Sequence, residues 1–241
     1  GTIPLHALLL RRRPEDLGLQ PDGVVLPGPG GDAATSFKGR GSEEKSIPAK
    51  IALRGSAFWW MTLAFFLNTV ALGGLSVHLI PFLTDHGYDG SFAASMLGLV
   101  GIMALPGRLV FTILGEKLPR SLLAACLFSL QTISLVVLLL TYSSTAGVIA
   151  FVIIFGIGFG AITPARAALV ADFYGRRHYA TINSVLALFA TAARAVGPFT
   201  VGLAFDTIGN YQPAFWTLAG ISALAVISIV IAENKRPSSQ K

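Results

Sequence analysis

Six long apolar runs, separated by short polar segments, fill the chain from residue 57 onward. They cover residues 57–83, 92–114, 122–142, 148–171, 182–205 and 215–231. Each run has roughly 17 to 27 residues, and about 20 apolar residues in a helix cross the hydrocarbon core of a bilayer. The pattern therefore predicts one domain of six transmembrane helices, residues 57–232, followed by a short tail at 233–241.

The first 56 residues follow a different pattern. Residues 1–10 are apolar but too short to span a bilayer, and the basic run Arg11-Arg12-Arg13 follows them. A secretory signal has the reverse order, with its positive charges first. We interpret this piece as the end of a transmembrane helix whose beginning is missing. Residues 11–56 are rich in glycine, proline, serine and charge, which predicts a largely flexible linker.

Composition supports a membrane protein. Of the 241 residues, 53% are hydrophobic and only 12% are charged, whereas about 25% of the residues in a soluble domain are charged. The formal net charge of +6 could suggest a nucleic-acid partner, but the basic residues lie in short stretches between apolar runs and form no continuous basic face. We therefore expect a lipid bilayer as the surroundings and no nucleic-acid partner.

Motifs for enzymatic chemistry are missing from the sequence. The single cysteine, Cys126, lies in an apolar run and forms no metal-binding cluster. The glycines of Gly156-Ile157-Gly158-Phe159-Gly160 lack the strand and helix context of a dinucleotide loop, and are typical of close helix packing instead. We expect no enzyme activity, no metal and no cofactor.

Lysine and arginine mark one side of the membrane. Basic residues occupy the linker, the loops after the second and fourth runs, and the tail, whereas residues 84–91, 143–147 and 206–212 contain none. Because basic loops stay on the cytoplasmic side, the linker and the C-terminus are predicted to be cytoplasmic. We expect a multi-pass protein of the cytoplasmic (inner) membrane.

Arg194 is an isolated charge near the middle of the run 182–205. It lies about thirteen residues, or roughly 20 Å, from the cytoplasmic end of its helix. An arginine at such depth costs at least ~2.5 kcal/mol on insertion scales and should face the bundle interior or a water-filled cavity. It either binds a ligand or hydrogen-bonds backbone carbonyls to brace a kink at Gly197-Pro198, where we expect the proline to interrupt the helix.

Other polar residues in the runs are further candidates. Arg108 lies eight residues before Glu116, about 12 Å from the cytoplasmic end of its helix, so it either faces a cavity or reaches the interface along its own side chain. Arg166 lies nearer to its helix end, and we interpret it as structural. Asn68 could bond a substrate and His78 could carry a proton; the alternative for both is a packing role.

The loop after the second run reads Gly115-Glu116-Lys117-Leu118-Pro119-Arg120. An acid at a helix end beside basic residues can form charge-assisted bonds to a neighbouring helix end, and release them when that side opens. Glu116, Lys117 and Arg120 are therefore candidate gate residues on the cytoplasmic side. The alternative is a solvated loop that only sets topology.

Several segments resemble the major facilitator superfamily. Residues 12–23 resemble the sequence after the sixth helix in many bacterial members, and residues 115–120 resemble a degenerate copy of the cytoplasmic loop signature. Residues 171–177, with Gly197-Pro198 and the Phe205-Asp206 pair, are similar to the tenth and eleventh helices. The resemblance implies the all-α C-terminal half of a twelve-helix secondary transporter, starting inside helix six. Its fold would be a three-plus-three inverted repeat, and its partner the missing N-terminal six-helix half.

Within the superfamily, the chain is similar to the monocarboxylate-transporter and oxalate:formate-antiporter branches, where cations on helices eight and eleven handle carboxylates. By that resemblance Arg108 corresponds to the helix-eight arginine and Arg194 to the helix-eleven cation. Two guanidinium groups without a nearby acid repel each other unless an anion joins them. We therefore expect a small organic anion, a mono- or dicarboxylate, moved through alternating access by uniport, proton symport or anion exchange. The alternatives are a non-transporting six-helix assembly or channel subunit, and a superfamily member with a non-anionic substrate.

Overall fold

The computed structural model describes residues 46–237; the expected helix end at 1–10, most of the expected linker and the last four residues of the tail lie outside this range. Six helices in it are long and apolar enough to span a membrane: α3 Ser56–Asp85, α4 Gly90–Leu114, α5 Arg120–Thr141, α6 Thr145–Tyr174, α7 Tyr179–Ile208 and α8 Gln212–Asn234. Each agrees with one predicted run to within a helical turn at both ends. The prediction of an all-α fold with six spans is confirmed.

Local signals explain several helix ends. The carboxylate of Asp89 caps α4 by accepting hydrogen bonds from the backbone N–H groups of Ser91, at 2.8 Å, and Phe92. Gly209 ends α7 in the left-handed conformation, with φ of 72°, which glycine adopts without a steric penalty. Pro213 lies in the first turn of α8, where its missing N–H costs nothing.

A short additional helix, α2 Ala49–Arg54, lies in the segment expected to be a linker. Just before it, the backbone N–H of Ile47 donates to the carbonyl of Tyr174 at 3.0 Å, and the hydroxyl of Ser46 accepts from the backbone N–H of Arg177 at 3.2 Å. Ala52 of α2 is buried. The end of the expected linker is thus packed against the end of α6.

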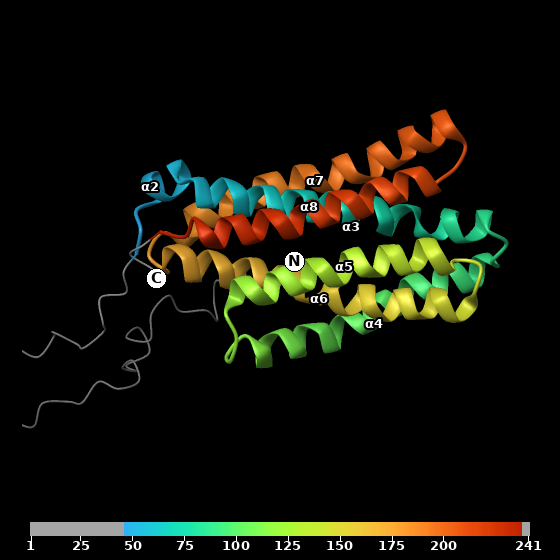
Figure 1. Ribbon diagram of the computed structural model, residues 1–241, viewed down its shortest axis with the longest axis horizontal. Coiled ribbons are helices and arrows are strands. Elements are labelled where there is room, and N and C mark those ends of the chain that lie inside the picture. The colour runs from blue at the N-terminus through green and yellow to red at the C-terminus, as the bar shows by residue number, and fades with distance from the viewer. Residues whose placement is uncertain (1–45, 238–241) are drawn as a thin grey trace, which may run out of the picture. The chain divides into compact units, whose positions relative to one another are not determined.

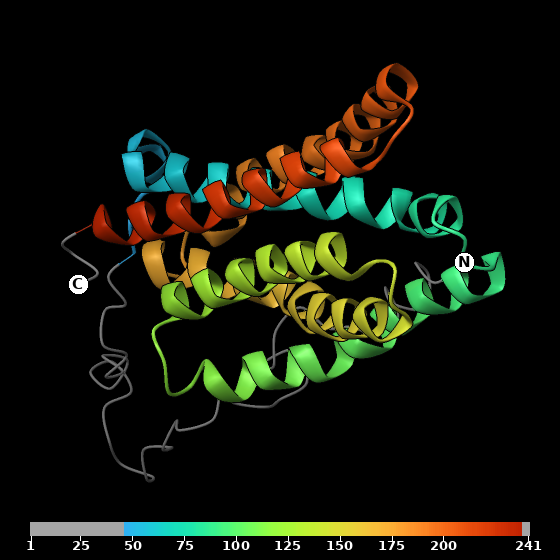
Figure 2. The same ribbon diagram turned by 45° about the vertical axis from the view of Figure 1, so that its right-hand side comes forward.

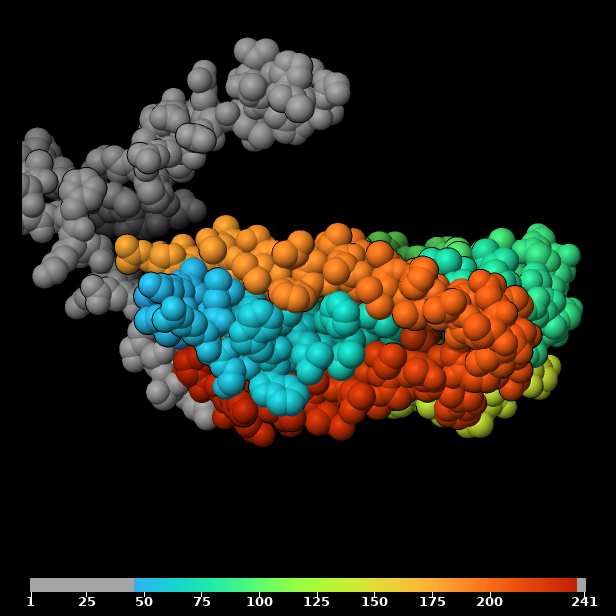
Figure 3. Space-filling view, turned by 90° about the horizontal axis from the view of Figure 1, so that it is seen from above, coloured from blue at the N-terminus to red at the C-terminus, as the bar shows by residue number. Residues whose placement is uncertain are grey.

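The six spans form an inverted repeat. α3 packs along α7 and α8, α6 packs along α4 and α5, and α5 meets α8 (Figures 1 and 2). Figure 3 shows α7, α3 and α8 side by side on one face. If α3 is exchanged with α6, α4 with α7 and α5 with α8, the same pairs of helices remain in contact. The first helices of the two repeats, α3 and α6, begin 89 residues apart, at Ser56 and Thr145. Because successive spans alternate in direction, a repeat of three spans is inverted.

Two close helix crossings hold this arrangement. Gly197 of α7 lies against the backbone of Val70 and Gly74 in α3, and Gly107 of α4 lies against the backbone of Ile157 in α6. A Cβ atom at either Gly197 or Gly107 would overlap those backbone atoms. Small residues let transmembrane helices approach to this extent, where packing rather than a hydrophobic driving force holds them together.

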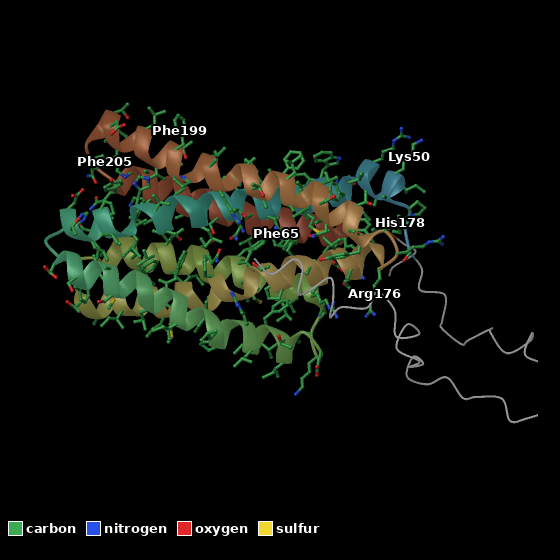
Figure 4. All side chains as sticks on the ribbon, turned by 180° about the vertical axis from the view of Figure 1, so that it is seen from behind. Lys50, Phe65, Arg176, His178, Phe199 and Phe205 are labelled. Atoms are coloured by element: carbon green, nitrogen blue, oxygen red, sulfur yellow. The ribbon has the colours of Figure 1, made fainter. Side chains whose placement is uncertain are left out.

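The two ends of the bundle differ in charge. Lys50, Arg176 and His178 gather at one end, and Phe205 lies toward the other, with Phe65 between them (Figure 4). At the basic end Arg236, just beyond α8, pairs with Asp172 of α6, with Nη2 3.1 Å from the carboxylate. Buried apolar side chains form two large clusters, one toward each end of the bundle, and a smaller third cluster that includes Phe111. The segments at the opposite end, between α3 and α4, α5 and α6, and α7 and α8, contain no lysine or arginine.

Candidate functional site

A cavity of about 340 Å³ lies among α3, α4, α6 and α7, with room for roughly ten water molecules at liquid density. Its lining residues are Phe65, Thr69, Leu72, Gly73, Ser76, Arg108, Phe159, Ile162, Thr163, Arg166, Ala190 and Arg194. Three arginines, three hydroxyl groups and apolar side chains therefore share one space. None of these described lining residues is acidic.

Arg108 and Arg194 come together in this cavity from α4 and α7, two helices that correspond in the inverted repeat. Arg108 lies six residues before the end of α4 at Leu114, and Arg194 lies fifteen residues after the start of α7 at Tyr179. At ~1.5 Å per residue these positions are about 9 Å and about 22 Å from the basic end of the bundle. The cavity therefore reaches from near that end to the middle of the spans.

Arg108 is engaged by the protein itself. Its Nε donates a hydrogen bond to the carbonyl of Gly160 in α6, at 3.3 Å. That carbonyl has no helical partner, because the residue four positions later is Pro164, which has no N–H. Arg108 therefore has the bracing role that the sequence suggested as the alternative for Arg194.

Arg194 differs from Arg108 in this respect. Within residues 46–237, no hydrogen bond or ion pair from its guanidinium to another residue is found, and the side chain is exposed to the cavity. α7 runs from Tyr179 to Ile208 and contains both Gly197 and Pro198, so the helix does not end at this proline, and the kink there stays a prediction. The close contact between Gly197 and α3 keeps the helix packed there, and His78 bonds the carbonyl of Pro198 through Nε2 at 3.0 Å.

Arg166 is the residue that sequence reasoning missed. It lines the same cavity from α6 and is half-buried. Its Nε is buried and has no hydrogen-bond partner among the described residues. The interpretation as a structural residue used only its distance from the helix end, whereas the direction of its side chain depends on how α6 packs. The nearby Pro164 was the available signal, because a proline inside a span marks a place where polar groups must be satisfied by neighbours.

Asn68 and His78 do not line the cavity. Asn68 is fully buried, and neither amide atom of its side chain has a partner among the described residues.

His78 lies nearer the outer end, with its ring 5.4 Å from that of Tyr211. Burial raises the pKa of Tyr211, and the charges of Asp85 and Asp206 raise it further, so this tyrosine stays neutral at physiological pH. The roles of Asn68 and His78 in substrate or proton binding stay predictions.

The candidate gate residues lie at the basic end. Glu116 and Lys117 are exposed, while Nη1 of Arg120 donates to the carbonyl of Ala168 in α6 at 3.4 Å. Glu116 and Arg120 border a smaller hollow of about 280 Å³ with Pro164 and Ala168. The ion pairs within residues 46–237 involve Arg236 and not Glu116. The gating role stays a prediction, and Arg120 is the member of the set that contacts another helix.

Two curated proteins are similar to this chain in sequence. Monocarboxylate transporter 13 of Bos taurus is 28% identical over 182 residues, which are 74% of this chain and 42% of that protein. Monocarboxylate transporter 13 of Rattus norvegicus is 28% identical over 158 residues, 64% of this chain and 36% of that protein. The chain thus spans less than half the length of the curated relatives it matches.

A solved structure shares the fold. The E. coli fucose:proton symporter superposes with a TM-score of 0.62 at 18% sequence identity, over 76% of this chain and 44% of that protein. At this identity the likeness concerns the fold alone. The family model of the Major Facilitator Superfamily matches residues 2–198 and, in a second match, residues 123–241. With six spans in an inverted repeat and a family match over most of its length, the chain belongs to the major facilitator superfamily.

Proposed function

We propose that this chain is the C-terminal half of a twelve-helix secondary transporter that moves a small organic anion, a mono- or dicarboxylate, by alternating access. The observation that carries the proposal is the cavity in which Arg108, Arg166 and Arg194 meet without an acidic lining residue among those described. Membership of a transporter superfamily also agrees with the expectation that the chain is not an enzyme.

The electrostatics of the cavity favour an anion. A cation inside a bilayer needs a counter-charge or water, and several guanidinium groups in one low-dielectric space repel one another. A carboxylate lowers this repulsion and matches the planar fork of arginine with two parallel hydrogen bonds. The relatives named monocarboxylate transporter support the same class of substrate.

The exposed faces of α4 and α7 support a missing second half. In an apolar stretch of 18 residues within each span, 22% of the residues of α4 and 28% of those of α7 are buried. In the other four spans the buried share is 44–50%. The exposed apolar side chains of these two helices include Leu105, Leu109, Leu188 and Phe199. In transporters of this type the substrate site lies between two halves that rock against each other. The isolated 241 residues should therefore insert into a membrane without catalysing substrate-specific uptake.

The basic end supports a cytoplasmic orientation in the inner membrane, with the C-terminus inside the cell. Arg120 and its neighbours Glu116 and Lys117 would then lie at the cytoplasmic gate. A reporter fused after Lys241 should read as cytoplasmic, and one inserted at Asp89 as external. An external signal from the fusion after Lys241 would overturn this orientation.

Uptake of labelled small carboxylates into vesicles that contain the complete transporter tests the function. We expect saturable uptake of at least one mono- or dicarboxylate, with competition by other carboxylates and none by neutral sugars. Arg194→Gln should weaken substrate affinity about ten- to a hundredfold, because a charge-assisted bond is lost, and Arg194→Lys should weaken it less. Wild-type affinity in a well-folded Arg194→Gln protein would remove this residue from the site. Uptake of neutral solutes alone would favour the non-anionic alternative, and no uptake at all the non-transporting subunit.

A further inference from the structure

We propose that Arg166 is an anion-binding residue that acts with Arg194, and that the pair makes the cavity selective for a dicarboxylate. This inference rests on the proposed function and specifies its substrate class. Sequence resemblance pointed to Arg108 and Arg194 as the pair of binding cations. The contacts within the cavity assign the roles differently.

The first step concerns Arg108. The Nε of Arg108 is used by the Gly160 carbonyl that Pro164 leaves without a helical donor. A substrate that engaged the full fork of Arg108 would have to compete with this bond, and would leave a carbonyl unsatisfied inside the membrane. Arg108 therefore acts as a brace on α6 and contributes its charge to the cavity.

The second step concerns Arg166. This side chain lines the cavity one helical turn from Ile162, which is also a lining residue. Its Nε is buried and has no hydrogen-bond partner in the described part of the chain. The side chain as a whole is only half-buried and lines a cavity in which no described lining residue is acidic, so a ligand in the cavity is the available counter-charge for its guanidinium. A carboxylate in the cavity is an acceptor of the right charge and geometry.

The third step concerns the number of charges. Arg166 and Arg194 extend from two different helices, α6 and α7, into the same space. Each planar fork binds one carboxylate, so two forks on different helices match a substrate with one carboxylate at each end. A monocarboxylate would bind one of these two forks and leave the other without an acceptor. A cavity of about 340 Å³ holds a short dicarboxylate together with several waters.

The test measures uptake of labelled succinate and labelled lactate by the complete transporter in vesicles, for the wild type and for Arg166→Gln, Arg166→Lys and Arg177→Gln. Arg177 lies at the basic end outside the cavity, so Arg177→Gln is the matched loss of one positive charge. We expect the wild type to prefer succinate. Arg166→Gln should raise the KM for succinate about ten- to a hundredfold and abolish the preference for succinate over lactate. Arg166→Lys should recover part of the affinity for succinate. Arg177→Gln should behave as the wild type.

The outcomes separate this inference from the proposed function. An unchanged KM for succinate in a folded Arg166→Gln protein overturns the role of Arg166. If the wild type takes up lactate and not succinate, the dicarboxylate selectivity is wrong and the proposed function stands. If it takes up neither carboxylate, the result counts against the proposed function itself. If both Arg166 variants fail to reach the membrane in folded form, as judged by yield and melting temperature, Arg166 is structural and the inference is wrong.

Discussion

The crossing of α3 with α7 and the crossing of α4 with α6 are equivalent in the inverted repeat, yet they use their arginines differently. Both depend on a glycine against a backbone, Gly197 in one and Gly107 in the other, and both contain a proline inside a span. At the α4–α6 crossing, Arg108 donates to the carbonyl freed by Pro164. At the α3–α7 crossing, the arginine extends into the cavity without such a bond.

The difference shows that corresponding places in the repeat do not fix what an arginine contacts. Arg108 donates to the protein's own backbone, whereas Arg194 lines the cavity without a hydrogen-bond partner among residues 46–237. At the α4–α6 crossing, Pro164 leaves the Gly160 carbonyl without a helical donor, and Arg108 is placed to donate to it.

The largest expected loss of stability comes from adding a methyl group at either crossing, which tests whether the two crossings are equally close. Gly197→Ala and Gly107→Ala would each place a Cβ closer to a neighbouring backbone atom than the sum of their van der Waals radii. A helix backbone cannot move aside as the end of a side chain could. We expect each to lower the free energy of unfolding in detergent by roughly 3 kcal/mol or more. Gly98→Ala on the outer part of α4, where no atom lies within 4 Å of the new Cβ, is the control and should be neutral or slightly stabilising. Wild-type stability of Gly197→Ala would contradict the close crossing.

A second prediction compares the two arginines by stability. Arg108→Met and Arg194→Met each remove one charge from the same cavity, but only the first leaves the Gly160 carbonyl without a donor. We expect Arg108→Met to be less stable than Arg194→Met by about 1 kcal/mol. Denaturant unfolding of both variants measures the difference. Equal stabilities would show that the 3.3 Å bond from Arg108 contributes nothing.

A double-mutant cycle sharpens this result. Pro164→Ala restores the N–H that an uninterrupted α6 would donate to the Gly160 carbonyl, so Arg108 is no longer needed as a donor. In this background the cost of Arg108→Met should fall by about 0.5–1 kcal/mol. The same cycle with Arg194→Met should show no coupling free energy with Pro164→Ala. A coupling free energy of equal size in both cycles would mean that Pro164 acts through the shape of the cavity.

The smallest expected effect concerns the contact of α5 with α8. Thr132 of α5 donates from Oγ1 to Oγ of Ser222 in α8, at 2.9 Å. Hydrogen bonds between transmembrane helices contribute about 0.6 kcal/mol on average, so Ser222→Ala should destabilise by about that amount. Ser95→Ala, on an exposed position of α4, should cost nothing measurable. A loss well above 1 kcal/mol would show that this bond organises both crossings rather than joining α5 to α8 alone.

Much of the fold could be predicted from the sequence. Apolar runs of spanning length placed all six helices, because a bilayer requires each spanning segment to satisfy its own backbone hydrogen bonds. The depth of Arg108 and Arg194 followed from the constant rise of a helix. The basic segments identified one end of the bundle, since lysine and arginine are not distributed evenly across a membrane.

The faces of the helices were decided only by the tertiary structure. In a span that is apolar all round, periodicity does not show which side is buried, so the sequence could not tell that Arg166 faces the cavity and Asn68 does not. The bond from Arg108 to Gly160 and the docking of Ile47 on Tyr174 each join residues far apart in the chain. Such contacts depend on the rotation of each helix about its own axis, and the packing of neighbouring helices at glycines such as Gly107 and Gly197 sets that rotation.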